Sequence, residues 1–137
     1  MSSTVLHLDS ISKTFGSGDA KVEALKGIDL EVKAGELVAL VGPSGSGKST
    51  MLSIAGALLS PTEGTISLDG QHISRLSEAE RTQLRLKKIG FIFQGSNLVS
   101  FLRGRDQLMF IARLLGIADS EAMDHAQKWM EDSVYEM

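Results

Sequence analysis

The sequence contains no cysteine, no long apolar run and no strong excess of charge of either sign. Without cysteine, the 137-residue chain can form neither disulfides nor thiolate metal sites. Its formal net charge of −3 is mild and does not suggest a surface for nucleic acid or a polybasic membrane anchor. No apolar stretch approaches the roughly 18 residues that span a bilayer, and MSSTVLHLDS is not a secretory signal. These absences predict a soluble, cytoplasmic domain that does not bind nucleic acid.

The most informative stretch is LVALVGPSGSGKST, at residues 37–50. The apolar run from Leu37 to Val41 predicts a strand buried on both faces of a parallel sheet. The next eight residues match the phosphate-loop pattern G-x-x-x-x-G-K-[ST]. In such a loop, glycines let several backbone N–H groups face one phosphate, and the following helix presents its positive end. A chance match in so short a chain has a probability of about one per cent, so we interpret the stretch as a nucleotide-binding loop.

The loop pattern also predicts roles for individual residues. Lys48 supplies a positive charge to the β- and γ-phosphates, and the Ser49 hydroxyl binds Mg²⁺. We expect nucleotide contacts along the whole loop, at Gly42, Pro43, Ser44, Gly45, Ser46, Gly47, Lys48, Ser49 and Thr50. A GTPase would need an Asn-Lys-x-Asp segment to read guanine, and the sequence has none. A small-molecule kinase is compatible with the loop alone but does not explain the motifs described below.

Hydrophobic periodicity and turn signals predict alternating strands and helices along the rest of the chain. We expect strands at residues 5–8, 28–32, 65–68 and 89–93, a turn at 12–20, and helices at 48–59, 78–88, 106–115 and from 119 onward. Asp69-Gly70 is a strong hairpin signal, and Ser77 with Glu80 forms a predicted capping box. The series predicts an α/β fold, with a parallel core sheet and helices and an antiparallel N-terminal subdomain.

Four segments together indicate a family: VEALKGIDLEVKAGE, GPSGSGKST, GTISLDG and IGFIFQGSNL. With these segments the chain resembles the ATP-binding subunit of ABC transporters over about residues 4–132. The sequence around Gln94 is most similar to that of the subgroup that serves lipoprotein release, macrolide export and haem efflux. The resemblance implies the N-terminal part of a P-loop NTPase fold, in one incomplete nucleotide-binding domain. Residues 1–94 would then form the β subdomain and phosphate-loop core, and residues 95–137 the start of the helical subdomain.

The resemblance assigns roles to residues outside the loop. Phe15 stands where the family has an aromatic side chain that stacks on adenine, although a surface aromatic is the simpler alternative. Val22 lies near the second adenine contact but is also an ordinary strand residue. Gln94 matches the glutamine that reaches Mg²⁺ and the attacking water and senses the membrane partner. Residues 96–102 fall where the permease docks, and core packing is the competing explanation of their apolar side chains.

Three motifs of the family are missing: the LSGG signature, the apolar strand that ends in Asp-Glu, and the switch histidine. No catalytic residue can therefore be identified. In the family, ATP lies between the phosphate loop of one subunit and the signature of a second, so the resemblance implies a dimer. We expect a truncated chain in which the Leu37–Val41 strand has an unpaired edge, which predicts marginal solubility.

The implied function is that of an ATP-binding subunit, which couples ATP binding and hydrolysis to export or membrane extraction by a partner permease. The cofactors implied are ATP and Mg²⁺, and the location is the inner face of the cell membrane, reached through the permease. Members of the family are ATPases, but the resemblance does not imply that this chain hydrolyses ATP by itself. The alternative is a non-hydrolysing nucleotide-binding remnant or regulatory module. The transported substrate is not encoded in this subunit.

Overall fold

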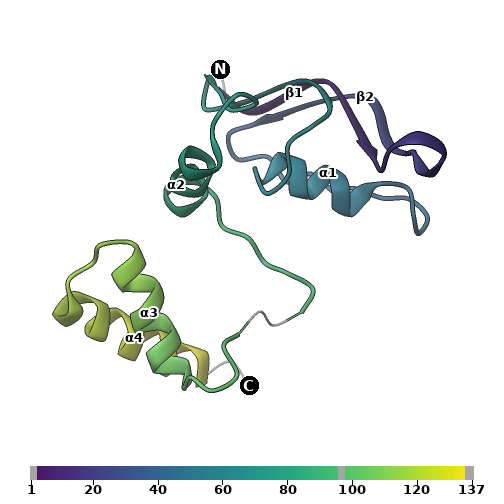
Figure 1. Ribbon diagram of the computed structural model, residues 1–137. Coiled ribbons are helices and arrows are strands. Elements are labelled where there is room, and N and C mark those ends of the chain that lie inside the picture. Colours follow the sequence, from purple (N-terminus) through teal and green to yellow (C-terminus); the bar gives the residue numbers. More distant parts are fainter. Residues whose placement is uncertain (1–2, 96–97, 135–137) are drawn as a thin grey trace. The chain divides into compact units, whose positions relative to one another are not determined.

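The structure is a computed structural model that describes residues 3–95 and 98–134. The chain divides into two compact units, Met1–Ile89 and Gly90–Met137 (Figure 1). Each unit has its own cluster of buried apolar side chains. None of the helices in the described part of the chain is both long enough and apolar enough to cross a membrane.

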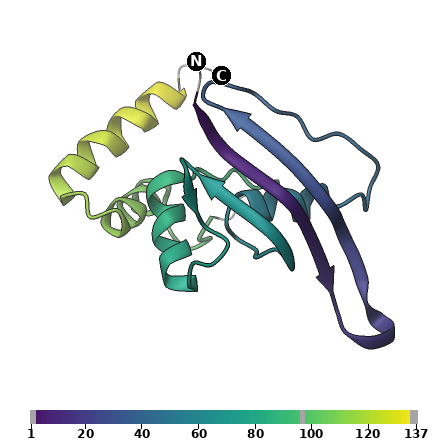
Figure 2. The same ribbon diagram turned by 90° about the horizontal axis from the view of Figure 1, so that it is seen from above.

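The first unit is built on a four-stranded antiparallel sheet with the strand order β2-β1-β3-β4. β1 (Thr4–Phe15) and β2 (Val22–Lys33) form a long hairpin, and Figure 2 shows its two strands side by side. β3 (Glu63–Leu68) pairs with the other edge of β1, and the short β4 (Gln71–His72) completes the sheet.

The hairpin is longer than the sequence predicts. Residues 12–15 were expected in a turn, but they continue β1 and pair with the beginning of β2. The chain reverses only after Phe15, at Gly16 and Gly18, which take positive φ angles, and in the short 3-10 helix η1 (Gly18–Ala20). The sequence correctly predicts the alternation in β2, where Asp29 and Glu31 are exposed between partly buried apolar residues.

The turn and capping signals are confirmed. Asp69 and Gly70 have φ angles of 48° and 76°, as a two-residue hairpin turn between β3 and β4 requires. α2 (Glu78–Lys88) begins with the predicted capping box, in which Ser77 and Glu80 satisfy each other's backbone N–H groups. Both features are encoded within four residues, so tertiary contacts do not change them.

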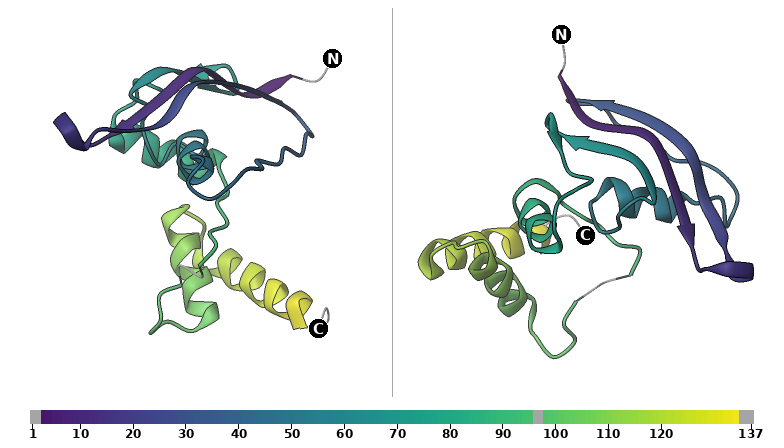
Figure 3. Two further views of the ribbon diagram at one scale, coloured as in Figure 1. Left: turned by 90° about the vertical axis from the view of Figure 1, so that its right-hand side faces the viewer. Right: turned by 45° about the horizontal axis from the view of Figure 1, so that its top comes forward.

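α1 (Lys48–Ala55) lies against one face of the sheet (Figures 1 and 3). Its Met51 and Ile54 are buried with Leu8, Ile11 and Ile66 of the strands. The helix was expected to reach Leu59, but it ends at Ala55 and is followed by the C-cap residue Gly56. Ala57 then takes a φ of 55°, which turns the chain back toward β1 and β3.

Two predicted strands of the parallel core are not formed in the described residues. Leu37–Val41 is extended chain without a ladder partner, and Leu37 is 99% exposed. Residues 89–93 also form no strand, and Ile92 is 100% exposed. A strand buried on both faces needs neighbours that satisfy its N–H and C=O groups and layers that cover it. The α/β class and its antiparallel part are confirmed, whereas these two segments lack what would make them strands.

The second unit contains two helices, α3 (Gly104–Leu114) and α4 (Asp119–Val134), which pack against each other. Met109 and Ala112 of α3 meet Ala122 of α4 in its small core. Both helices begin within two residues of the predicted positions. Gly116, with a φ of 75°, follows the end of α3 as the sequence predicts.

Candidate nucleotide-binding site

The phosphate loop lies where the extended segment from residue 36 to residue 43 turns into α1. Gly47 is the residue before the helix and has a φ of 85°. A Cβ atom on Gly47 would lie 2.5 Å from the carbonyl oxygen of Ala24 and 2.8 Å from Cδ2 of Leu25. A Cβ atom on Gly42 would lie 2.9 Å from Ser46 Oγ. The loop is therefore pressed against β2 and curled on itself, in a shape that these glycines permit.

Lys48 is held over this loop by the loop's own oxygen atoms. Its Nζ donates hydrogen bonds to the carbonyl oxygens of Gly42, at 2.9 Å, and Pro43, at 2.6 Å. A third, longer contact of 3.3 Å joins Nζ to Ser46 Oγ. Lys48 is also the first residue of α1, whose N-terminus carries a partial positive charge. The ammonium group and the helix end thus concentrate positive charge at one small loop, which suits an anionic ligand.

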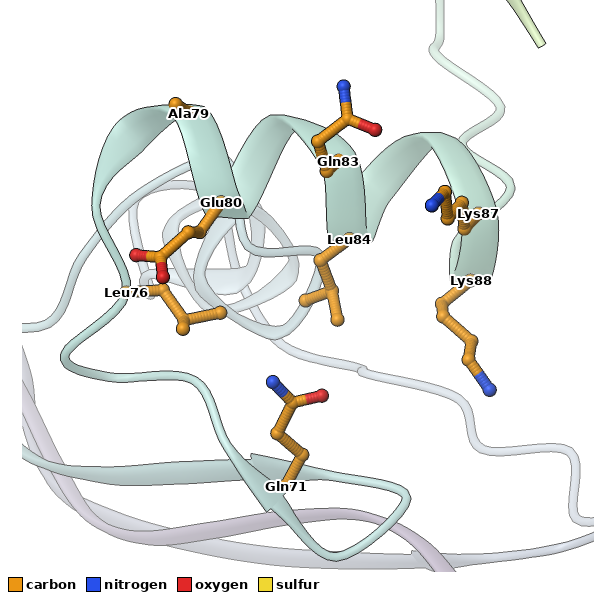
Figure 4. A pocket seen from close by; sticks show the side chains of 8 residues that line it. All are labelled: Gln71, Leu76, Ala79, Glu80, Gln83, Leu84, Lys87 and Lys88. Atoms are coloured by element: carbon orange, nitrogen blue, oxygen red, sulfur yellow. The ribbon is translucent and has the colours of Figure 1, made fainter. Parts of the chain in front are cut away.

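A cavity of about 300 Å³ opens beside the loop. It is lined by Leu25, Ile28, Leu40, Val41, Gly42, Pro43, Ser46, Gly47, Lys48 and Met51. A larger cavity of about 460 Å³ lies between α2 and Gln71 of β4, and it includes none of the predicted nucleotide-binding residues (Figure 4). Of these two cavities the smaller one is the better candidate site, because the glycine loop, the Lys48 ammonium group and the helix N-terminus meet at it.

The remaining loop residues are accessible to a ligand. Pro43, Ser44 and Gly45 are exposed in the turn, and Ser49 is exposed in the first turn of α1, followed by the half-buried Thr50. In the part of the chain that the structure describes, no three His, Asp or Glu side chains form a group that could hold a metal ion. Mg²⁺ commonly takes one or two protein ligands and completes its shell with water and phosphate oxygens. A single Ser49 hydroxyl beside a phosphate site fits that mode of binding.

Phe15 and Val22 are brought together with the phosphate loop in the first unit. They face each other in the last residue pair of the β1–β2 hairpin, and their side chains are 41% and 62% exposed. The loop approaches β2 a few residues away, where Gly47 meets Ala24 and Leu25. The predicted adenine contacts and the predicted phosphate contacts therefore lie at the same end of one hairpin.

Lys13 is a residue of this region that the sequence did not single out. Its Nζ lies 5.3 Å from the centre of the Phe15 ring. It also donates a hydrogen bond of 2.8 Å to the carbonyl oxygen of Ser60. The signal in the sequence is that Phe15 follows Lys13 by two positions, a spacing that puts both side chains on one face of a regular strand.

Gln94 belongs to the second unit, and its predicted contact with the metal site stays a prediction. Its side chain is exposed in a bend after Phe91 and Phe93, whose rings stack with centroids 4.8 Å apart. The expected permease-docking segment, residues 96–102, lies partly outside the described residues, at positions 96 and 97. In its described part, Leu98 and Phe101 are exposed, at 66% and 85%.

Comparison with known proteins gives consistent matches. The model of the family described as "ABC transporter" matches residues 25–136. The chain is 49% identical over 127 residues to the "Putative hemin import ATP-binding protein HrtA" of Staphylococcus haemolyticus, covering 93% of this chain and 57% of that protein. It is 42% identical over 127 residues to the "Lipoprotein-releasing system ATP-binding protein LolD" of Bacteroides fragilis, with the same two coverages of 93% and 57%. It is 41% identical over 131 residues to the "Macrolide export ATP-binding/permease protein MacB 1" of Aeromonas hydrophila subsp. hydrophila, covering 96% of this chain and 20% of that protein.

The fold also matches solved structures. The "Dimeric structure of a post-hydrolysis state of the ATP-binding cassette MJ0796 bound to ADP and Pi" aligns with a TM-score of 0.82 and 36% sequence identity. The alignment covers 90% of this chain and 54% of that one. The chain thus spans little more than half the length of HrtA, LolD and the MJ0796 cassette.

Proposed function

The chain belongs to the ABC transporter family, and from this premise we propose that it binds ATP at residues 42–50 as part of the ATP-binding subunit of a transport system. The observation that carries the proposal is the loop itself. A glycine-containing turn at the start of α1 holds the Lys48 ammonium group through the carbonyl oxygens of Gly42 and Pro43. Backbone donors and positive charge gathered at one turn support the binding of a triphosphate there.

The proposed roles of the residues follow from their positions. The backbone N–H groups of the loop and Lys48 would bind the phosphates, and the side chains of Phe15 and Val22 would contact the base. Ser49 would hold Mg²⁺, and the family resemblance supports Gln94 as a further residue that reaches the metal. When bound, Mg²⁺ neutralises negative charge on the phosphate oxygens and orients them.

ATP hydrolysis is proposed for the family domain and not for this chain acting alone. Hydrolysis requires a group that positions the attacking water, and we propose that a carboxylate has this role in the complete family domain. The described residues that line the 300 Å³ cavity include no Asp or Glu. We therefore expect binding by the chain alone, and turnover only where another polypeptide segment supplies the missing group.

Transport is proposed to involve a membrane permease and a second ATP-binding subunit, at the inner face of the cell membrane. The names of the relatives support this role, because they describe ATP-binding proteins of a lipoprotein-releasing system, of hemin import and of macrolide export. The dimeric cassette structures support pairing of two subunits. Release and export are named for two of these three relatives, so we propose export or membrane extraction as the direction. The names favour a transport subunit over a regulatory remnant.

The test is to measure ATP binding and ATP turnover with the purified full chain, its Lys48→Ala variant and a Lys33→Ala control. Lys33 is an exposed lysine at the far end of β2, so the control removes the same charge away from the loop. We expect the wild-type chain and the control to bind Mg-ATP without turnover, and Lys48→Ala to bind at least about tenfold more weakly. Equal binding by Lys48→Ala, or no binding by the wild type, would refute the proposal. Turnover by the wild type would show that the chain supplies its own water-positioning group.

A further inference from the structure

Lys13 connects the Phe15 ring to a different part of the first unit. Its ammonium group lies over the ring, 5.3 Å from the centroid, and is bonded at 2.8 Å to the carbonyl oxygen of Ser60. Ser60 follows α1 in the chain, at the opposite end of that helix from the phosphate loop. One half-buried side chain therefore links the predicted base contact to the segment that leaves α1.

The anchor at Ser60 is firmly attached to the sheet. Thr62 donates its backbone N–H to the Ser12 carbonyl oxygen at 2.8 Å, and its hydroxyl accepts a hydrogen bond of 3.0 Å from the N–H of Thr14. The Ser60 hydroxyl accepts a further hydrogen bond from the guanidinium group of Arg81 in α2. The carbonyl oxygen that holds Lys13 is thus fixed from β1 and from α2.

The Phe15 ring lies at an exposed end of the sheet. It stands at the last position of β1, is 41% exposed, and is paired with Val22 across the hairpin. An exposed aromatic side chain at a strand end can change rotamer, and each such side chain loses entropy when a ligand orders it. An ammonium group over one face of the ring favours a single ring position through the cation–π attraction.

We propose that Lys13 is a positioning residue for nucleotide binding, which holds the Phe15 ring with one face against its ammonium group and the other face open to a purine base. The inference rests on the proposed function, because it gives Lys13 a part in the same site. Lys13 acts on the base through Phe15, whereas Lys48 acts on the phosphates. The two lysines should therefore affect different portions of one ligand.

The experiment compares Mg-ATP with Mg-tripolyphosphate, which carries the phosphates without the base, by calorimetric titration of the full chain. We expect Lys13→Met to weaken ATP binding about two- to fivefold and to leave tripolyphosphate binding unchanged. Lys13→Arg should restore ATP binding, because a guanidinium group also stacks on aromatic rings. Lys33→Met is the matched control and should change neither affinity.

A double-mutant cycle separates positioning from a general effect of charge or folding. In the Phe15→Ala background, Lys13→Met should cause no further loss of ATP affinity, because the ring it positions is gone. A loss that persists in that background, an equal loss of tripolyphosphate binding, or unchanged ATP binding by Lys13→Met would each overturn the inference. If Phe15→Ala binds ATP as the wild type does, the inference fails while the phosphate-loop proposal stands.

A measurement without nucleotide decides the placement of Lys13 even if the proposed function fails. The aromatic NMR signals of Phe15, assigned with the Phe15→Ala variant, should shift in Lys13→Met and stay in place in Lys33→Met. Unshifted ring signals in Lys13→Met would refute the contact itself. If the wild-type chain binds neither ligand, the proposed function is refuted, and the inferred role in binding falls with it while the ring contact is still judged by its signals.

Discussion

Gly47 is the residue on which the geometry of the phosphate loop depends most directly. It combines a φ of 85° with a close approach to the Ala24 carbonyl, so an alanine there meets both backbone strain and a clash. We expect Gly47→Ala to lower the free energy of unfolding by about 1–3 kcal/mol and to weaken ATP binding. Gly45→Ala is the matched control, because Gly45 has a φ of 79° but no atom within 4 Å of the position of an added Cβ. This substitution should lower the free energy of unfolding by about 1 kcal/mol. Equal denaturation midpoints for the two variants in urea would contradict the role of the close approach.

Phe15 offers a second test of a single residue. If its ring stacks on the base, Phe15→Ala should weaken ATP binding by about 1–3 kcal/mol, and Phe15→Tyr should preserve it because the ring face is kept. Phe101→Ala, at an 85% exposed position of the second unit, serves as the control. Titration with ATP measures all three variants, and an alanine variant that binds as well as the wild type would leave Phe15 as a surface aromatic only.

The shape and charge of the phosphate loop could be predicted from the sequence because their requirements are local, whereas nucleotide contact by its residues stays a prediction. The pattern from Gly42 to Ser49 states both the backbone shape and the charge, and the structure has both. The contacts of Lys13 could not be predicted in the same way. They depend on Ser60, which is 47 positions away in the sequence and lies beside β1 only in the folded tertiary structure.

The capping box is the clearest case at the level of one element. Ser77→Ala should lower the free energy of unfolding of the first unit by about 1 kcal/mol, since the α2 N-terminus loses its side-chain acceptor. Ser17 is the control, because it precedes η1 and makes no side-chain capping bond. Thermal denaturation of both alanine variants tests the difference, and a Ser17→Ala variant that is as destabilised as Ser77→Ala would argue against capping as the cause.

The same box predicts a dependence on pH. Hydrogen bonds from the Ser77 hydroxyl and backbone N–H lower the pKa of Glu80. A carboxyl group with a lowered pKa in the folded state stabilises the fold above its ordinary pKa, and this stabilisation is lost as the pH falls through the lowered pKa. Stability should thus decline as the pH falls below 4.5, the ordinary pKa of a glutamate side chain, and less steeply in Ser77→Ala. Parallel pH profiles for the two proteins would show that the hydrogen bond from the Ser77 hydroxyl to Glu80 does not contribute.

Elements differed in how well the sequence predicted them, and the reason is the range of their contacts. The Asp69-Gly70 hairpin and the α2 start are fixed by neighbouring residues and were predicted correctly. The prediction of a buried strand at Leu37–Val41 was wrong for this structure, because a strand exists only when another strand pairs with it. In the described residues no strand does so.

At the scale of the whole molecule, the exposed apolar segments predict self-association. Leu37, Val41 and Ile92 are 99%, 89% and 100% exposed, on extended chain whose N–H and C=O groups can pair with another molecule. We expect sedimentation velocity to show association that increases with concentration, and the double variant Leu37→Lys/Ile92→Lys to reduce it. The control Ser17→Lys adds a charge at an exposed polar site and should leave the association unchanged. A monomeric wild-type chain at all concentrations, with one cooperative melting transition, would contradict this prediction.

The strand order also has a kinetic consequence. Because β3 pairs with β1, the phosphate loop and α1 lie within the chain segment that this pairing closes. Closing a long segment costs entropy before its contacts form, so such pairings fold slowly, whereas a hairpin such as β1–β2 forms early. Competence to bind nucleotide should therefore appear late in refolding. In stopped-flow experiments, binding of a fluorescent ATP analogue should lag behind the recovery of β-sheet circular dichroism, and simultaneous recovery would show that the loop is assembled before β3 joins the sheet.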